Sequence, residues 1–309
     1  MTGANLTYLS LLLLLLFPLG LLVVLYLITR PRPARVPIKN RHVFITGGSS
    51  GIGLALAHRA ASEGARVSIL ARSIDKLEAA KQEILLSTGI DVAVFAADVR
   101  DYDALSRAVE EAGPIDVLVV NQGVFVPQEL ERQGLDEVKF MLDVNLMGAF
   151  NMVKAALPAI KLQRRDRGPG SIALMSSQAG QAYMIIKSYT LYWPETKIRP
   201  QLTSIIAASS GAMKADEVAK RALDGIKSGS FIIPCNFEGL LLSIATAGFS
   251  PQRSVLMAFV EIVAAGITRF AALCFLWNWY GSIEKWHAKQ HFGEGFKVVE
   301  SLLRDNQRN

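Results

Sequence analysis

Cysteine, histidine and clustered charge are scarce in this sequence of 309 residues, and each scarcity argues against a class of function. The two cysteines, Cys235 and Cys274, form no Cys-x-x-Cys pair and predict neither a disulfide framework nor a zinc site. His287 and His291 are four positions apart, as metal ligands on one helix face can be, but no third ligand accompanies them. The net charge of +6 comes without the long basic block typical of nucleic-acid binding. We therefore expect no metal site and no nucleic-acid partner.

Charged side chains are also missing from the start of the chain, between Thr2 and Thr29. The stretch Leu6–Ile28 is mostly apolar, and as a helix rising about 1.5 Å per residue it would be about 34 Å long, enough to cross a hydrocarbon core of about 30 Å. A cleaved signal peptide is the alternative, but the basic first segment and the small-x-small cleavage site of such peptides are lacking. Residues 1–30 are therefore predicted to be an uncleaved transmembrane anchor.

Basic residues begin where the apolar stretch ends, and none precedes it: Arg30, Arg32, Arg35, Lys39 and Arg41. By the positive-inside rule, this asymmetry places the main domain in the cytosol and the amino terminus in the lumen. Residues 31–39 are rich in proline, which favours an extended linker between the anchor and the domain.

A glycine-rich turn joins the first predicted strand, His42–Gly48, to a helix with a regular apolar spacing. The joint reads Thr46-Gly47-x-x-x-Gly51-Ile52-Gly53. Glycines let the backbone turn sharply and let a pyrophosphate approach the amino end of the helix, where free N–H groups and the helix dipole attract negative charge. On its own, the motif is also compatible with a turn that binds nothing.

The residue type at the end of the second predicted strand, Arg66–Arg72, indicates which cofactor such a turn would hold. Folds that bind NAD commonly place an acidic residue there for the ribose 2′-hydroxyl. Here the position is taken by Arg72, whose guanidinium suits a 2′-phosphate. NADPH is therefore preferred over NADH, with a simply solvated Arg72 as the alternative.

Three more strands complete an alternating pattern: one ending near Asp98, then Ile115–Val120 and Ser171–Ser177. Helical patterns lie between the strands, at Ile74–Leu86, Tyr102–Glu111 and Leu135–Lys161. Such alternation predicts an α/β fold with a doubly wound parallel sheet, and ligands bind such sheets at the carboxyl ends of the strands.

Taken in order, these motifs resemble the short-chain dehydrogenase/reductase family. The resemblance extends from about Asn40 to Gln181 and includes TGGSSGIG at Thr46–Gly53, Asp98-Val99, NQG at Asn121–Gly123, Asn145, and SSQAG at Ser176–Gly180. It implies a Rossmann-like NADP-binding reductase domain over residues 40–235.

The same resemblance implies roles for single residues. The cofactor would be held by Gly47, Ser49, Ser50, Gly51, Ile52, Gly53, Asn121 and Gly123, its 2′-phosphate by Arg72 and Lys76, and its adenine by Asp98 and Val99. Asn145 would hold a water of the proton relay. Ser177 or its neighbour Ser176 would donate a hydrogen bond to the substrate carbonyl oxygen.

A narrower resemblance is to the 3-ketodihydrosphingosine reductases, a group within that family. It is based on the apolar start, "VVNQGVFVPQELE", "LTSIIAASSGAMKADEVAK" and "SPQRS". It implies NADPH-dependent reduction of 3-ketosphinganine to sphinganine in sphingolipid synthesis. It also implies an endoplasmic reticulum membrane location with the catalytic domain facing the cytosol; whether a homodimer forms stays open.

The stretch that should supply the proton departs from the family pattern. Tyr183 and Lys187 form a Tyr-x-x-x-Lys pair, but Tyr183 follows Ser177 by six residues where the family has about thirteen. If "SYTLYWPE" at Ser188–Glu195 is the sixth strand, only ten residues remain for a crossover that needs about a dozen or more. The domain is thus predicted to be truncated around 178–200. The alternative function is a catalytically inactive membrane-bound NADPH-binding or scaffolding isoform.

The last third of the chain becomes strongly apolar again after a helical pattern at Ala215–Gly229 and an expected final strand at Ser230–Pro234. Residues 236–309 are predicted to be a membrane-associated hairpin and tail. The second apolar stretch contains Glu261 and Arg269, which are costly inside a membrane. A spanning helix, an interfacial hairpin and a helix packed on the domain therefore all stay open.

Overall fold

The computed structural model describes residues 3–29, 35–126, 133–177, 213–248, 250–252, 254–271, 273–274, 277 and 281. Its centre is a five-stranded parallel sheet in the order β3-β2-β1-β4-β5. The strands are β1 (His42–Thr46), β2 (Arg66–Ala71), β3 (Ala93–Ala96), β4 (Val117–Val120) and β5 (Ser171–Leu174). The strand order reverses between β1 and β4, which is where parallel sheets of this kind open a crevice for a ligand. The predicted α/β doubly wound sheet is confirmed.

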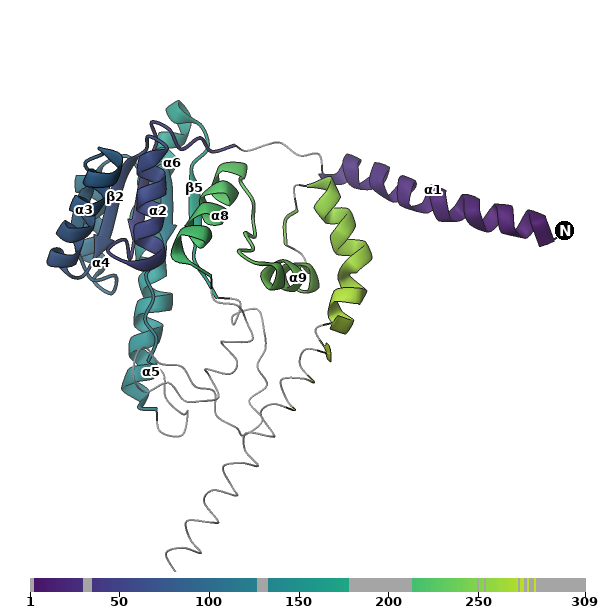
Figure 1. Cartoon of the computed structure of the whole chain (residues 1–309). Coiled ribbons are helices and arrows are strands. Elements are labelled where there is room, and N and C mark those ends of the chain that lie inside the picture. The colour runs from purple at the N-terminus through teal and green to yellow at the C-terminus, as the bar shows by residue number, and fades with distance from the viewer. Residues whose placement is uncertain are drawn as a thin grey trace, which may run out of the picture.

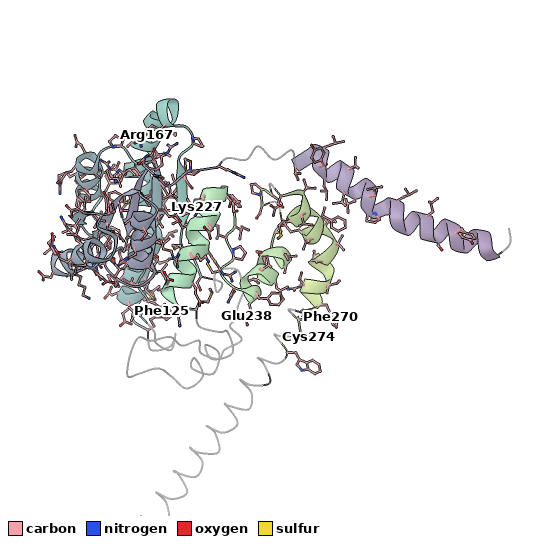
Figure 2. The ribbon with its side chains drawn as sticks, turned by 45° about the horizontal axis from the view of Figure 1, so that its top comes forward. Phe125, Arg167, Lys227, Glu238, Phe270 and Cys274 are labelled. Atoms are coloured by element: carbon pink, nitrogen blue, oxygen red, sulfur yellow. The ribbon has the colours of Figure 1, made fainter. Side chains whose placement is uncertain are left out.

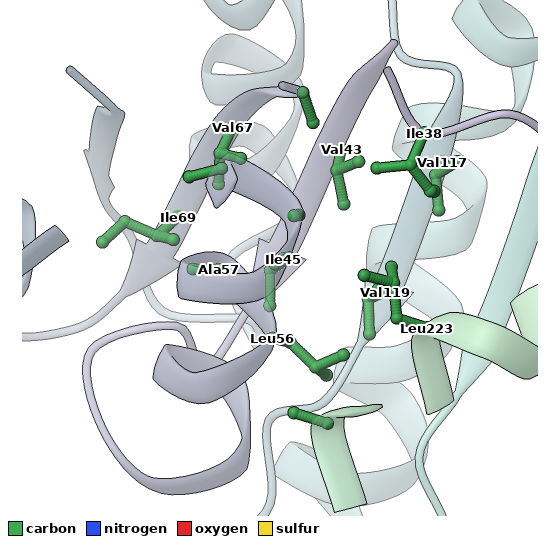
Figure 3. Packing of buried hydrophobic residues seen from close by; sticks show 14 of the residues in the cluster. Ile38, Val43, Ile45, Leu56, Ala57, Val67, Ile69, Val117, Val119 and Leu223 are labelled. Carbon is green, nitrogen blue, oxygen red and sulfur yellow. The ribbon is translucent and has the colours of Figure 1, made fainter. Parts of the chain in front are cut away.

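Helices cover both faces of this sheet (Figure 1). One face packs against α2 (Gly51–Ser62), α3 (Ile74–Thr88) and α8 (Ala215–Ser228), and Figure 3 shows Ile45 and Val119 of the sheet near Leu56 and Leu223 of the helices. The other face packs against α4 (Tyr102–Ala112) and α6 (Gly148–Arg167). Because both faces are covered, β1 and β4 are buried along their whole length, and every residue of β4 is apolar.

The helix expected over Leu135–Lys161 contains an irregular turn. It consists of α5 (Leu135–Leu142), a π-helical turn η1 (Asp143–Met147) and α6. A π turn holds one residue more than an α turn, and such turns are frequent at functional sites. The combined helix runs the length of the domain, from the end where Phe125 lies to the end where Arg167 lies (Figure 2).

An ionic cluster closes the sheet at the amino ends of its strands. The side chain of Asp116 is 1% exposed; its carboxylate lies 2.9 Å from Arg41 Nη1 and 3.3 Å from Arg167 Nη1, and it accepts a 2.8 Å hydrogen bond from the backbone N–H of His42. The His42 ring is 2% exposed and lies between Ser68 Oγ and the Pro114 carbonyl. Burial lowers the pKa of His42 to about 4.

The segment expected as a linker contributes to the core. Val36 and Ile38 are both buried, and the backbone N–H of Val36 donates a 3.0 Å hydrogen bond to the Lys227 carbonyl at the end of α8. The chain is therefore attached to the domain at least four residues before position 40.

The apolar start of the chain forms one long helix, α1 (Gly3–Thr29), with Pro18 inside it. In Figure 1 it extends away from the sheet, and Phe17 and Ile28 are each 73% exposed. Among the described residues, one helix is long and apolar enough to span a membrane, Leu135–Lys161, which packs on the sheet; a shorter apolar helical stretch is Leu16–Thr29.

The final strand predicted at Ser230–Pro234 is wrong: these residues follow α8 without strand structure. Strand geometry needs a hydrogen-bonded neighbour, and among the described residues β5 and residues 231–235 line one cavity of about 930 Å³ without pairing. Leu174 on β5 is 63% exposed, so among the described residues β5 is an open edge of the sheet. The expected sixth strand at Ser188–Glu195 lies outside the described residues.

Two apolar helices follow. They are α9 (Phe237–Ala245) and a helix over residues 255–271 that lies near the end of α1 (Figure 1). The side chains of Ile267 and Phe270 on the second helix are 71% and 69% exposed.

Candidate functional site

The glycine-rich turn has the backbone that its sequence predicts. Gly47 and Gly51 have positive φ angles of 64° and 56°, which favour glycine. A side chain at Gly53 would lie 2.6 Å from Asn121 Nδ2 and closer still to the Gly47 carbonyl oxygen. The turn therefore needs glycine at these three positions, two for conformation and one for close packing of the first turn of α2 against β1.

The amino end of α2 is free to meet a negatively charged group. Ser50 precedes the helix with extended backbone angles, and its side chain makes no capping hydrogen bond. Among the described residues, the Ser50 side chain thus leaves the N–H groups of the first turn uncapped, which is the arrangement that binds phosphate. This part of the structure fits a dinucleotide.

The end of β4 is tied to this turn by the Asn121 side chain and by the hydroxyl of Thr46. Asn121 donates its backbone N–H to Thr46 Oγ1 at 2.9 Å and its Nδ2 group to the carbonyls of Thr46 and Gly47, both at 3.3 Å. Gln122 accepts a hydrogen bond from the same Thr46 hydroxyl, while its Nε2 is buried without a hydrogen-bond partner among the described residues. The Asn121 side chain thus holds the glycine-rich turn against the end of β4.

Basic side chains lie beyond the ends of β2 and β3. Arg72 and Lys76 are exposed, and Ser73 caps α3 between them by accepting a hydrogen bond from Lys76 N. Asp98 accepts hydrogen bonds from Arg100 Nε at 3.0 Å and from Arg100 Nη2 at 2.7 Å. The Arg100 side chain, aided by its backbone N–H and by the charge of Arg72, lowers the pKa of Asp98. The carboxylate is therefore ionised at neutral pH and able to accept hydrogen bonds.

Asn145 lies in the π turn and holds the loop after β4. Its Oδ1 accepts a 2.8 Å hydrogen bond from Val124 N, and its Nδ2 donates one of 2.8 Å to the Val124 carbonyl. Each polar atom keeps capacity for one further hydrogen bond. The side chain is therefore committed to positioning this loop and can still bind a water molecule.

The two serines expected to meet the substrate follow β5. The backbone there is held to β4 by a 2.9 Å hydrogen bond from Met175 N to the Val120 carbonyl. Ser176 and Ser177 lie on the wall of the 930 Å³ cavity. Tyr183 and Lys187, the expected proton donor and its helper, lie outside the described residues.

The structure brings the expected residues after β1, β3 and β4 to one end of the sheet, and it adds four that sequence reasoning missed. Thr46 links β1 to β4. Arg100, Gly148 and Asn151 surround the loop after β3. The spacing of Asn145, Gly148 and Asn151 is the signal that could have found the last two, because small or polar residues every third position mark one face of an otherwise apolar helix.

Comparison with known proteins gives a consistent result. Residues 41–191 match the family model described as short chain dehydrogenase. A 3-dehydrosphinganine reductase of Arabidopsis thaliana is 57% identical over 296 residues, covering 84% of this chain and 90% of that protein. A 3-dehydrosphinganine reductase of Danio rerio is 30% identical, covering 84% of this chain and 91% of that protein.

Among solved structures, a short chain dehydrogenase from Mycobacterium paratuberculosis bound to NAD is 29% identical with a TM-score of 0.44. That match covers 47% of this chain, and this chain spans 59% of the length of that one.

The Arabidopsis relative also has positions that this chain lacks. It runs over 296 residues, yet 84% of 309 residues is about 260, so about 36 positions are filled in the relative alone. With nine-tenths of that relative covered, and with the motifs at the ends of β1, β3 and β4 in place, the chain belongs to the short-chain dehydrogenase family.

Proposed function

We propose that this chain is a 3-dehydrosphinganine reductase that uses NADPH to form sphinganine. The observation that supports the substrate is the 57% identity to the Arabidopsis enzyme of that name over nearly its whole length. Bound NADPH would supply a hydride to the carbonyl carbon. Ser177 or Ser176 would donate a hydrogen bond to the carbonyl oxygen as it becomes negative, and Asn145 would hold a water molecule on the path of the proton.

The cofactor would lie across the carboxyl ends of β1, β2 and β4. Its pyrophosphate would bind the turn Gly47–Gly53, with Ser49, Ser50, Gly51 and Ile52 at the amino end of α2. Asp98 and Val99 would contact the adenine, and Asn121 and Gly123 the nicotinamide ribose. Arg72 and Lys76 are proposed to bind the 2′-phosphate, and their exposure leaves them free to do so.

Arg72→Ala should weaken NADPH binding about tenfold and leave NADH binding within twofold. One charge-assisted hydrogen bond to phosphate is worth about 1.5–3 kcal/mol, and screening by salt reduces this value at an exposed site. Fluorescence titration of the full chain in detergent with each cofactor measures the two affinities. Arg107→Ala on the outer side of α4 is the matched control and should change neither. Equal losses for NADPH and NADH would contradict the 2′-phosphate role.

The second candidate function follows from the segment that should deliver the proton. About 36 positions of the Arabidopsis relative have no counterpart here, and Tyr183 follows Ser177 by only six residues. The alternative is therefore a catalytically inactive membrane-bound isoform that retains NADPH affinity and serves as a binding or scaffolding protein.

One pair of measurements on the purified chain separates the two candidates. NADPH oxidation with 3-ketosphinganine in detergent tests the reductase, and equilibrium NADPH binding tests the cofactor half. NADPH binding without turnover favours the inactive isoform. If turnover occurs, Tyr183→Phe should reduce it at least a hundredfold, because general-acid catalysis contributes about 10²–10⁴-fold. Retained activity in that variant excludes Tyr183 as the proton donor.

Membrane association completes the proposal. We place α1 across the endoplasmic reticulum membrane with the sheet domain in the cytosol, supported by its 27 helical residues without a charged side chain and by the arginines that follow. The exposed apolar side chains of helix 255–271 suit contact with the same membrane. Protease digestion of sealed microsomes tests this: the sheet domain should be degraded without detergent.

A further inference from the structure

The loop after β3 is held from outside by the helix α5–η1–α6. The Nδ2 group of Asn151 donates a 3.1 Å hydrogen bond to the Val99 carbonyl and a longer one, 3.4 Å, to the Arg100 carbonyl. Both carbonyls belong to the turn between β3 and α4, and neither hydrogen bond is part of a helix or a sheet. One side chain on α6 therefore fixes the backbone that follows Asp98.

Gly148 allows this helix to lie directly on Val99. A Cβ atom at position 148 would lie 2.5 Å from Val99 Cγ2 and 3.0 Å from Val99 Cβ, and the first of these distances is shorter than real Cβ contacts allow. Val99 is 5% exposed, so it has little free space into which to move. Even alanine at position 148 must push the loop or the helix away.

A third attachment comes from Arg100. Its guanidinium group lies 5.2 Å from the centre of the Phe140 ring on α5 while it binds both carboxylate oxygens of Asp98. The Asp98 carboxylate is thereby oriented by an arginine that itself rests on the helix. The helix α5–η1–α6 thus contacts the loop in three ways: it binds the loop backbone, packs on Val99, and supports the arginine that orients the Asp98 carboxylate.

We propose that Gly148 and Asn151 are positioning residues that hold Asp98 and Val99 as the adenine-binding wall of the site. The helix thereby sets the affinity for the adenosine half of the dinucleotide. The inference depends on the proposed NADPH binding and adds to it two residues that contact the cofactor only through the loop. Because Asn145 of the same helix holds Val124, one element arranges the loops after both β3 and β4.

The test uses a probe for each half of the cofactor on the full chain in detergent: 2′,5′-ADP by calorimetry and reduced nicotinamide mononucleotide by saturation-transfer NMR. Gly148→Ala and Asn151→Leu should each weaken 2′,5′-ADP binding about tenfold and leave the mononucleotide within twofold. Leucine at position 151 has a similar volume without a donor. The matched control is Gly266→Ala, a helical glycine whose Cβ would meet nothing within 4 Å.

Hydrogen exchange provides a readout that needs no ligand. In both variants the amides of residues 99–101 should exchange faster while those of β1 and β4 keep their protection. Unchanged 2′,5′-ADP affinity in a folded variant overturns the inference, and so does equal weakening of both probes, which would indicate general unfolding. If the wild-type chain binds neither probe, the proposed cofactor function is wrong. If the wild-type chain binds both probes and the variants bind them equally well, only the positioning role of Gly148 and Asn151 is wrong.

Discussion

Replacing Asp116 with alanine should lower the free energy of unfolding by about 3–5 kcal/mol, since removing one partner from a buried ionic cluster leaves the remaining charge unpaired. The carboxylate is 1% exposed, lies 2.9 Å from Arg41 Nη1, and also accepts the backbone N–H of His42. The substitution therefore leaves the guanidinium groups of Arg41 and Arg167 without this carboxylate, and the buried backbone N–H of His42 without its acceptor. Urea unfolding of the full chain in detergent, followed by far-UV circular dichroism, measures the loss.

The contrast with an exposed pair makes the Asp116 result specific. Asp91 forms a 3.1 Å ion pair with Lys81 but is 65% exposed, so Asp91→Ala should cost no more than about 1 kcal/mol. Asp116→Asn should fall between the two alanine variants, because the amide can still accept the His42 N–H while losing the charge. If Asp116→Ala costs no more than Asp91→Ala, the cluster does not stabilise the sheet.

Acidification should destabilise the domain through His42 by about 3 kcal/mol in total, since one pKa unit corresponds to about 1.4 kcal/mol. The pKa of His42 is about 4 in the folded chain because burial opposes the charged ring, against 6.5 for an exposed histidine. The unfolded chain therefore binds more protons between these values. The contribution is complete above pH 6.5, is lost progressively as the pH falls to about 4, and is absent below that.

His42→Gln should flatten this part of the pH profile, since glutamine can occupy the space between Ser68 and the Pro114 carbonyl without titrating. The groups that face the ring, Arg66, Asp116 and Arg167, stay in place in this variant. Urea midpoints from pH 7.5 to 4, compared between wild type and variant, isolate the histidine.

Sequence periodicity and motif spacing were sufficient to predict the sheet and the glycine turn. Short apolar runs of β-branched residues such as residues 117–120 favour strands buried on both faces. The positive φ angles at Gly47 and Gly51 agree with glycine in a turn before a helix. Arg72 at the end of β2 could be placed because strand ends in parallel sheets lie at one edge. Local sequence patterns predict structure well where a single factor decides the local structure, such as burial for a strand or backbone conformation for a turn.

Long-range contacts were beyond such reasoning. The strand expected at Ser230–Pro234 has the right composition, but strand structure needs a neighbour, and the sequence does not show that a cavity lies between it and β5. The spacing of Gly148 could assign it to one face of its helix, but not to its contact with Val99, which is 49 positions earlier in the chain. The hydrogen bonds of Asn151 to the loop after β3 were hidden for the same reason.

The π turn at Asp143–Met147 also determines how this protein can change in evolution. It holds one residue more than an α turn, so a single deletion there would restore a regular helix while α5 and α6 keep their orientation. Gly148 and Asn151 would still face Val99, but Asn145 lies within the turn that is rebuilt and would lose its two hydrogen bonds to Val124. Substitutions at the exposed Leu146 and Met147 should be accepted, whereas insertions and deletions in these five residues should be eliminated by selection.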